Sequence, residues 1–209
     1  MPKRKGQKIS SRKSITRPRS KKRPTVLDRI PPEEAESVLR ALLDLHPHLR
    51  REAEDIAKAL VAEVQSEDIA DEVAHTILSI GLDALNSRAG RQPWGYVEPT
   101  EAAWELLQEA IEDLLGDMKR GTELGLESAA ESICRGIVLG LYQVKGSSTD
   151  GALGWAPDFP AEAATQVVSN FVEQHAPRQR KAAGKRLLDG LEEQVPEWME
   201  MLDRVVQQS

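Results

Sequence analysis

Apolar residues recur every three or four positions along almost the whole chain from Val26 onward. This spacing places them on one face of an α-helix, whereas sustained strand alternation and an Asn-Gly hairpin turn are absent from the sequence. Prolines and glycines interrupt the pattern in two long predicted loops, residues 90–100 and 145–160. The sequence therefore predicts an all-α fold with seven to eight helices arranged in antiparallel pairs.

One predicted helix, within residues 126–144, is apolar on nearly every side. A helix of this kind belongs in the interior of a domain. Gly136 and Gly140 lie one turn apart in it, and they would let a neighbouring helix approach closely. The helical pairs could stack as a short HEAT-like solenoid, which we favour, or close into an irregular bundle.

Charge is distributed very unevenly along the chain. The first 24 residues contain eleven Lys or Arg and no acid, whereas the whole chain has 28 basic and 34 acidic residues. The tail therefore carries +11, and the remainder carries −17 from 17 bases and 34 acids. Because Ile9 and Ile15 are its only sizeable apolar residues, the tail cannot bury enough surface to offset the entropy of ordering. We predict a disordered basic tail over residues 1–25 and a single all-α domain over residues 26–209.

Such a tail has two interpretations. Its cations could neutralise phosphates of a nucleic acid without reading bases, or they could attract an acidic protein, including the chain's own acidic domain. A second basic cluster, residues 178–186, could extend this contact or could be an ordinary charged helix face. The predicted contacts to phosphate or to an acidic partner are Lys3, Arg4, Lys5, Arg12, Lys13, Arg17, Arg19, Lys21, Lys22, Arg23, Arg178, Arg180, Lys181, Lys185 and Arg186.

Acidic residues form a row along the predicted helix that follows residue 100. Glu101, Glu105, Glu109 and Glu112 repeat every three or four positions, where like charges disfavour one another. The simpler interpretation is a solvated helix face, and the alternative is a docking surface for a basic peptide.

The aromatic residues are few, and two tryptophans lie in the predicted loops. Trp94 and Trp155 either pack over a helix end as a lid, which we favour, or mark a recognition surface. For the second case the predicted partner-binding residues are Trp94, Tyr96 and Trp155. The other two tryptophans, Trp104 and Trp198, lie within predicted helices and are expected in the core or in an interface.

The sequence offers little for catalysis. It lacks the nucleophile-elbow, P-loop and dinucleotide-binding motifs. Cys134 lies in the most apolar helix, where burial makes a thiol inert. Glu72 and His75 have the Glu-x-x-His spacing of di-iron bundles, but the second such motif that those bundles need is missing. We therefore expect no catalytic residue, metal or cofactor, and keep a metalloenzyme built on Glu72 and His75 as a third possibility.

The stretch GRQPWGYVEPTEAAWELLQEAIEDLL, followed later by ICRGIVLGLYQ and WAPDFPAEAA, resembles uncharacterised all-helical bacterial proteins without a settled activity. The resemblance covers about a third of the chain, leaves out the tail and transfers no site residues. It implies a bacterial, cytoplasmic helical scaffold. A reducing compartment also fits the single cysteine, and no apolar run reaches the roughly 18 residues of a membrane span.

These observations favour a non-enzymatic helical interaction or scaffold module that binds a protein partner and uses the basic tail as an electrostatic tether. The alternative is a nucleic-acid-binding protein that places the tail and the 178–186 cluster on phosphates. Neither interpretation involves a membrane.

Overall fold

The computed structural model describes residues 26, 29–62, 65–93, 95–147 and 150–209. Whereas one domain was predicted over residues 26–209, the chain divides into two compact units after Arg51. The first unit contains helix α1 (Pro32–Leu45) and a 3-10 turn, η1 (Pro47–Leu49). The division falls within helix α2 (Arg50–Ala62). Arg50 and Arg51 belong to the first unit, and the rest of the helix, from Glu52, belongs to the second.

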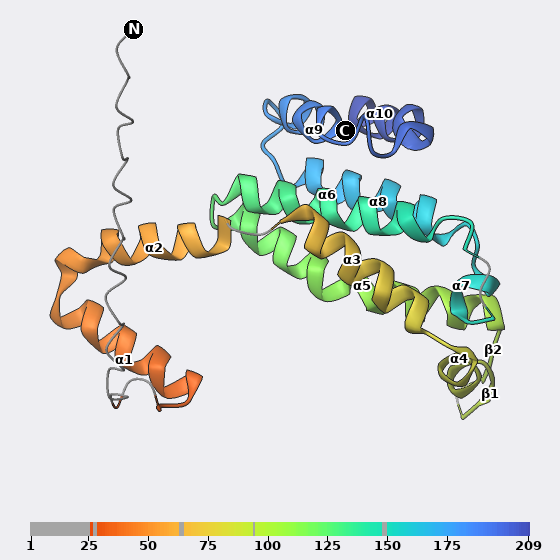
Figure 1. The fold of residues 1–209 in the computed structure, drawn as a ribbon, viewed down its shortest axis with the longest axis horizontal. Helices are drawn as coiled ribbons and strands as arrows, with labels where there is room; N and C mark the ends of the chain where they lie inside the picture. Colours follow the sequence, from red (N-terminus) through yellow and green to blue (C-terminus); the bar gives the residue numbers. More distant parts are fainter. Residues whose placement is uncertain (1–25, 27–28, 63–64, 94, 148–149) are drawn as a thin grey trace, which may run out of the picture. The chain divides into compact units, whose positions relative to one another are not determined.

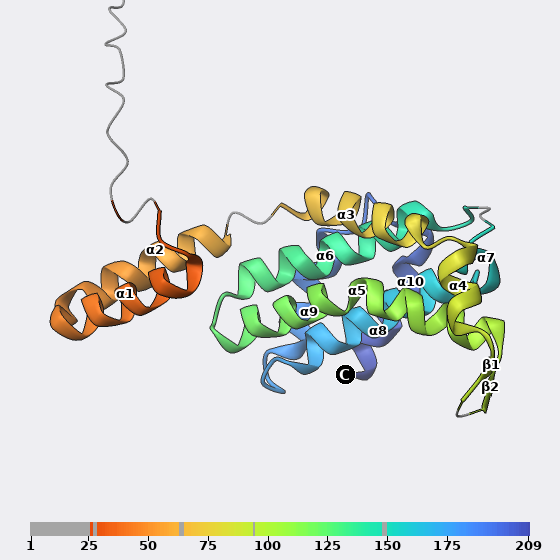
Figure 2. The same ribbon diagram turned by 90° about the horizontal axis from the view of Figure 1, so that it is seen from below.

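The second unit is built almost entirely from helices (Figures 1 and 2). Its elements after α2 are α3 (Ser66–Ser79), α4 (Leu82–Arg88), β1 (Gly90–Gln92), β2 (Gly95–Val97), α5 (Pro99–Glu123), α6 (Glu127–Val144), α7 (Ala152–Trp155), α8 (Phe159–Glu173), α9 (Arg180–Asp189), the 3-10 turn η2 (Pro196–Trp198) and α10 (Met199–Gln208). The all-α prediction is confirmed. The described residues form ten α-helices, more than the seven to eight expected.

Helix α6 lies at the centre of the second unit. It packs against α3, α5 and α8, and α9 and α10 then cover α8. Figure 1 shows three layers, with α9 and α10 above α6 and α8, and α3 and α5 below them. Because α6 has neighbours on several sides, this unit is an irregular bundle rather than the solenoid that we favoured.

The predicted interior helix is confirmed. In α6, eleven residues from Ala129 to Val144 are buried, including both Gly136 and Gly140. A Cβ atom added at Gly136 would lie 2.5 Å from the Cβ atom of Ile69, which is closer than side chains pack. At Gly140 the added atom would lie 2.6 Å from the carbonyl oxygen of Ala70. Both glycines are therefore the sites at which α3 crosses α6 with its backbone almost in contact.

The segment expected as a loop over residues 90–100 contains a short β-hairpin instead. Strands β1 and β2 pair antiparallel, with Gly90 opposite Val97 and Arg91 opposite Tyr96. Gly90 and Gly95 have φ angles of +90° and +149°, which side-chain-bearing residues rarely adopt. Three residues per strand are too few to show an alternating apolar pattern, so the sequence prediction missed them.

Two edge-to-face aromatic pairs join helices that are distant in sequence. The rings of Trp104 in α5 and Phe159 in α8 are 5.0 Å apart at 71°, and those of Tyr142 and Trp198 are 5.0 Å apart at 87°. Trp198 is buried, and the half-buried Trp104 packs on the core. The expected core position of both tryptophans is therefore confirmed.

Next to the second pair, Lys145 donates a hydrogen bond to the carboxylate of Glu197, and the hydroxyl of Tyr142 donates another at 3.3 Å. The hydrogen bond from Lys145 is the main cause that lowers the pKa of Glu197 below its ordinary value of 4.5. A carboxylate whose pKa is lower in the folded state than in the unfolded state stabilises the fold at pH values above its unfolded-state pKa. This stabilisation is lost as the pH falls through the folded-state pKa.

We therefore expect Glu197→Gln to lower the free energy of unfolding at about pH 7, with a smaller difference from wild type near pH 2, because protonation of Glu197 removes its charge. Urea titrations at both pH values would measure this. Glu193→Gln is the matched control, because Glu193 is exposed and forms no ion pair with any described residue. An equal loss at both pH values would contradict an ionic contribution from Glu197.

None of the helices in the described part of the chain combines the length and the apolar character needed to cross a bilayer.

Candidate functional site

One end of the second unit is formed by α4, the β-hairpin and α7, which lie together in both views (Figures 1 and 2). The backbone N–H of Ala152 donates to the carbonyl oxygen of Ile80 at 3.0 Å. Gly151 makes this approach possible, because a Cβ atom there would lie 2.1 Å from the same oxygen. Helix α7 is thus fixed to the junction of α3 and α4, although the two segments are far apart in sequence.

Large apolar side chains are exposed on the elements of this end. Leu78, Leu82, Tyr96 and Trp155 are 46%, 43%, 64% and 48% exposed. We call these four residues the aromatic end. The structure therefore brings two of the predicted partner-binding residues, Tyr96 and Trp155, to the same end of the bundle. Of the two tryptophans expected as lids, Trp155 is thus about half exposed, and Trp94 lies outside the described residues.

The sequence interpretation missed Leu78 and Leu82. Both lie off the apolar stripe of their segment, whose inward members include Val73 and Ile77. Two leucines one turn apart, outside a predicted buried stripe, were the signal that could have identified them.

Beside the aromatic end, Arg88 of α4 links the hairpin to α5. Its Nη1 atom lies 2.7 Å from Oε1 of Glu109 and 3.6 Å from Oε2 of Glu105. The hydrogen bond to Glu109 raises the pKa of the guanidinium group. The side-chain amide of Gln92 donates to the carbonyl oxygen of Arg88 at 2.9 Å, so β1 is held against the end of α4. A pocket of about 620 Å³ lies here, and its lining residues are Ser87, Arg88, Gln92, Val97, Glu105 and Glu109.

This contact bears on the row of glutamates on α5. Arg88 supplies a cation to Glu105 and Glu109, so the chain itself relieves part of their repulsion. Glu101 and Glu112 are exposed and form no ion pair with the residues that the structure describes. A docking surface for a basic peptide would have to compete with Arg88 at the centre of the row.

The second basic cluster does not form one continuous cationic surface. Arg180 donates to the carbonyl oxygen of Ser209 at 3.1 Å and so holds the C-terminal end of α10. Arg186 approaches α6, with Nε 3.5 Å from Oε2 of Glu131 and Nη2 3.6 Å from Oε2 of Glu127. The other predicted cations of the cluster are exposed and lack an ion pair within the described ranges: Arg178, Lys181 and Lys185.

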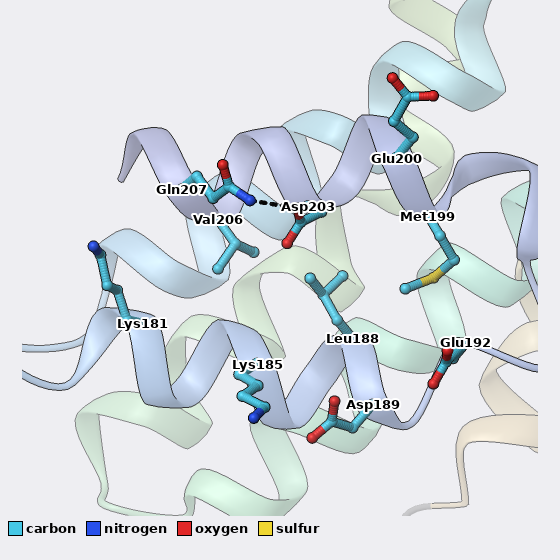
Figure 3. Close-up of a pocket in the computed structure, with 10 residues that line it drawn as sticks. All are labelled: Lys181, Lys185, Leu188, Asp189, Glu192, Met199, Glu200, Asp203, Val206 and Gln207. Carbon is cyan, nitrogen blue, oxygen red and sulfur yellow. Dashed lines mark hydrogen bonds between the residues drawn. The ribbon is translucent and has the colours of Figure 1, made fainter.

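Figure 3 shows a groove between α9 and α10, with a volume of about 570 Å³. Leu188, Met199 and Val206 line it with apolar surface. Its charged and polar lining residues are Lys181, Lys185, Asp189, Glu192, Glu200, Asp203 and Gln207. The two lysines lie toward one end, and Glu192 and Glu200 lie toward the other. The groove therefore offers both charge signs to a ligand, and acidic groups predominate.

The groups that could support catalysis are scattered. Cys134 is fully buried, and this burial raises the pKa of its thiol. Glu72 and His75 are both exposed on α3. Across the described ranges, no three His, Cys, Asp or Glu side chains lie close enough together to hold a metal ion. His175 is buried, and its Nδ1 atom lies 2.8 Å from the carbonyl oxygen of Phe171.

Trp94 and all the predicted tail contacts lie outside the described residues, so the structure does not place them. The tail contacts are Lys3, Arg4, Lys5, Arg12, Lys13, Arg17, Arg19, Lys21, Lys22 and Arg23.

No known protein family, curated protein or solved structure matches this chain. The resemblance to helical bacterial proteins stays a prediction, and the function has to be argued from the surface of the molecule.

Proposed function

We propose that this protein is a non-enzymatic helical interaction module, which binds a protein partner through the aromatic end and uses its basic tail as an electrostatic tether. One observation carries the proposal: α4, the hairpin and α7 lie together at one end of a packed bundle, and these elements and the last turn of α3 carry exposed large apolar side chains. A cytoplasmic scaffold is the setting that we propose for it.

The residue types suit a protein interface. Tyr and Trp are enriched in interface cores, because each buries a large area while ordering few rotatable bonds. Fully burying a large apolar side chain contributes about 1.5–3 kcal/mol, so the exposed parts of these four residues could supply a substantial share of a binding energy.

The surface is also held in place before a partner arrives. The bond between Ala152 and Ile80 fixes α7, and the pairing of Arg88 with Glu109 fixes α4 against α5. A preorganised surface loses less conformational entropy on binding than a flexible one. The tail would raise the association rate and the local concentration, whereas specificity would come from the aromatic end.

Replacement of Tyr96 and Trp155 by serine tests this proposal. The matched control is Leu124→Ser, because Leu124 is 61% exposed and lies in the turn between α5 and α6. We expect that a partner protein binds to the wild-type and Leu124→Ser chains but not to the double variant, in which both Tyr96 and Trp155 are serine. Calorimetry with the purified partner should then measure the two single substitutions. A substitution at a residue that dominates the binding energy should weaken the affinity at least roughly 30-fold.

Circular dichroism should show the same helix content and the same melting midpoint for all three proteins, since the substituted side chains are exposed. A partner that binds the double variant as tightly as wild type would exclude the aromatic end as its binding surface.

The second candidate function is nucleic-acid binding. It is favoured by the eleven cations of the tail, together with the exposed Arg178 just before α9 and the exposed Lys181 and Lys185 within it. The charge of −17 over residues 25–209 opposes it, because most of that surface would repel a phosphate backbone.

A further inference from the structure

The groove between α9 and α10 is a second surface, separate from the aromatic end. All of its lining residues come from these two helices and the turn that joins them, so the helix pair forms the groove by itself. Leu188, Met199 and Val206 form its apolar floor, and Figure 3 shows their side chains pointing into the space between the helices. The remaining lining residues are charged or polar.

The charges of α9 run against the dipole of that helix. Lys181 lies in its first turn, where the positive end of the dipole disfavours a cation. Asp189 is its last residue, where the negative end disfavours an anion, and Glu192 follows shortly after. All three side chains are exposed and form no ion pair with any residue that the structure describes. This order of charges therefore does not serve the stability of α9 itself.

The same charges divide the groove into a basic and an acidic half. Lys181 and Lys185 lie toward one end, whereas Glu192 and Glu200 lie toward the other. Glu200 is already paired with Arg204 outside the groove. A ligand that matches both halves must carry acidic groups at one end and basic groups at the other.

We propose that this groove binds an amphipathic helix of a partner protein, with acidic residues in the first turn of that helix and basic residues in its last turn. The partner helix lies parallel to α9, so its first turn is beside Lys181 and Lys185 and its last turn is beside Asp189 and Glu192. This order of charges is the one that the partner helix's own dipole favours. Apolar side chains one turn apart on its inner face rest on the floor of the groove.

The groove is held in shape before a partner helix arrives. A Cβ atom at Gly184 would overlap the side chain of Val206, so α9 and α10 lie in close contact there. Arg180 fixes the end of α10 through its hydrogen bond to the carbonyl oxygen of Ser209. Each helix has 10 residues, or about 15 Å, which matches two to three turns of a partner helix.

A second copy of the same helix pair fits the groove less well. Its exposed lining side chains are charged or polar, so the second copy would bring charged groups, and not an apolar ridge, onto the floor. The groove is also separate from the aromatic end, so either binding event can fail while the other holds.

Titration of the full chain with two synthetic peptides tests the proposal. Both peptides have about 14 residues and the same composition, with leucines at i, i+3, i+4 and i+7. One carries glutamates in its first turn and lysines in its last turn, and the other carries the reverse. The methyl NMR signals of Leu188, Met199 and Val206 report on the floor of the groove. We expect them to shift with the first peptide, and the reversed peptide should bind about tenfold more weakly at about 50 mM salt.

An exchange of the groove charges provides the matched variant. Lys181→Glu, Lys185→Glu, Asp189→Lys and Glu192→Lys together leave the net charge unchanged, so any general attraction of the peptides to the chain stays the same. The four side chains are exposed, and the new order of charges suits the dipole of α9, so the helix should persist. This variant should prefer the reversed peptide.

Several results would overturn the proposal. These are equal affinity of wild type for the two peptides, an unchanged preference in the exchanged variant, and no shift with either peptide up to about 1 mM. Floor signals that shift when the wild-type chain alone is diluted would show that a second copy occupies the groove, and this result would also overturn it.

Discussion

Replacing Gly140 with alanine is expected to lower the free energy of unfolding by about 1–3 kcal/mol. The added methyl group would lie 2.6 Å from the carbonyl oxygen of Ala70 and 2.6 Å from the Cβ atom of Val73. The first of these atoms is backbone, so it cannot move aside as a flexible side-chain end would. Helix α3 would have to shift away from α6, and the contacts of its buried stripe would loosen.

Gly116→Ala is the matched control, because it makes the same change on the exposed side of α5, where an added Cβ atom has nothing within 4 Å. In a helix this substitution should stabilise the fold by about 0.5–1 kcal/mol. The two variants should therefore shift the midpoint of a urea titration in opposite directions, with little change in slope. A neutral or stabilising effect of Gly140→Ala would show that α3 does not lie against α6 at this position.

The interior helix could be predicted because its signals are local. A segment that is apolar on every side needs neighbours on every side, and glycines one turn apart permit a close helix crossing. The partner in that crossing could not be predicted. Any helix with a smooth apolar face would fit Gly136 and Gly140, and the choice of α3 depends on the packing of the whole bundle.

The helix count was underestimated for a related reason. Helices α4 and α7 have only seven and four residues, so they span too few turns to show a period of their own. Both are held by tertiary contacts, such as the bond from Ala152 to Ile80, and the sequence around them does not encode these contacts locally.

The candidate site was predicted in part. Aromatic residues in loops are uncommon enough to single out Tyr96 and Trp155, but their meeting at one end depends on the same bond between Ala152 and Ile80. The 178–186 cluster shows the opposite case. Its cations are neighbours in sequence, yet the helical rotation turns Arg186 toward α6 while Lys181 and Lys185 line the groove beside α10. A run of charge on a helix is therefore a poor predictor of a charged surface.

The difference between a run of charge in the sequence and a charged surface matters for the nucleic-acid proposal. That proposal predicts that added salt strongly weakens the binding of nucleic acid. If about six tail cations neutralise phosphates of duplex DNA, the affinity should fall roughly 1,000-fold between about 50 and 200 mM salt, with a log–log slope near −5. Replacing all eleven tail cations by glutamine should abolish the binding, because residues 25–209 carry −17 without the tail. Fluorescence anisotropy with a generic labelled duplex would measure both effects.

The control replaces Arg178, Lys181 and Lys185 by glutamine, since these are the exposed cations of the second cluster. Each cation that contacts a phosphate should lower the magnitude of the salt slope by about 0.9 when it is removed. Arg180 and Arg186 hold the chain end and α6, so substituting them would confuse loss of binding with loss of stability. Wild-type protein that does not bind duplex DNA at about 100 mM salt would reject this second function. The tail would then act on an acidic protein surface, as the interaction-module proposal requires.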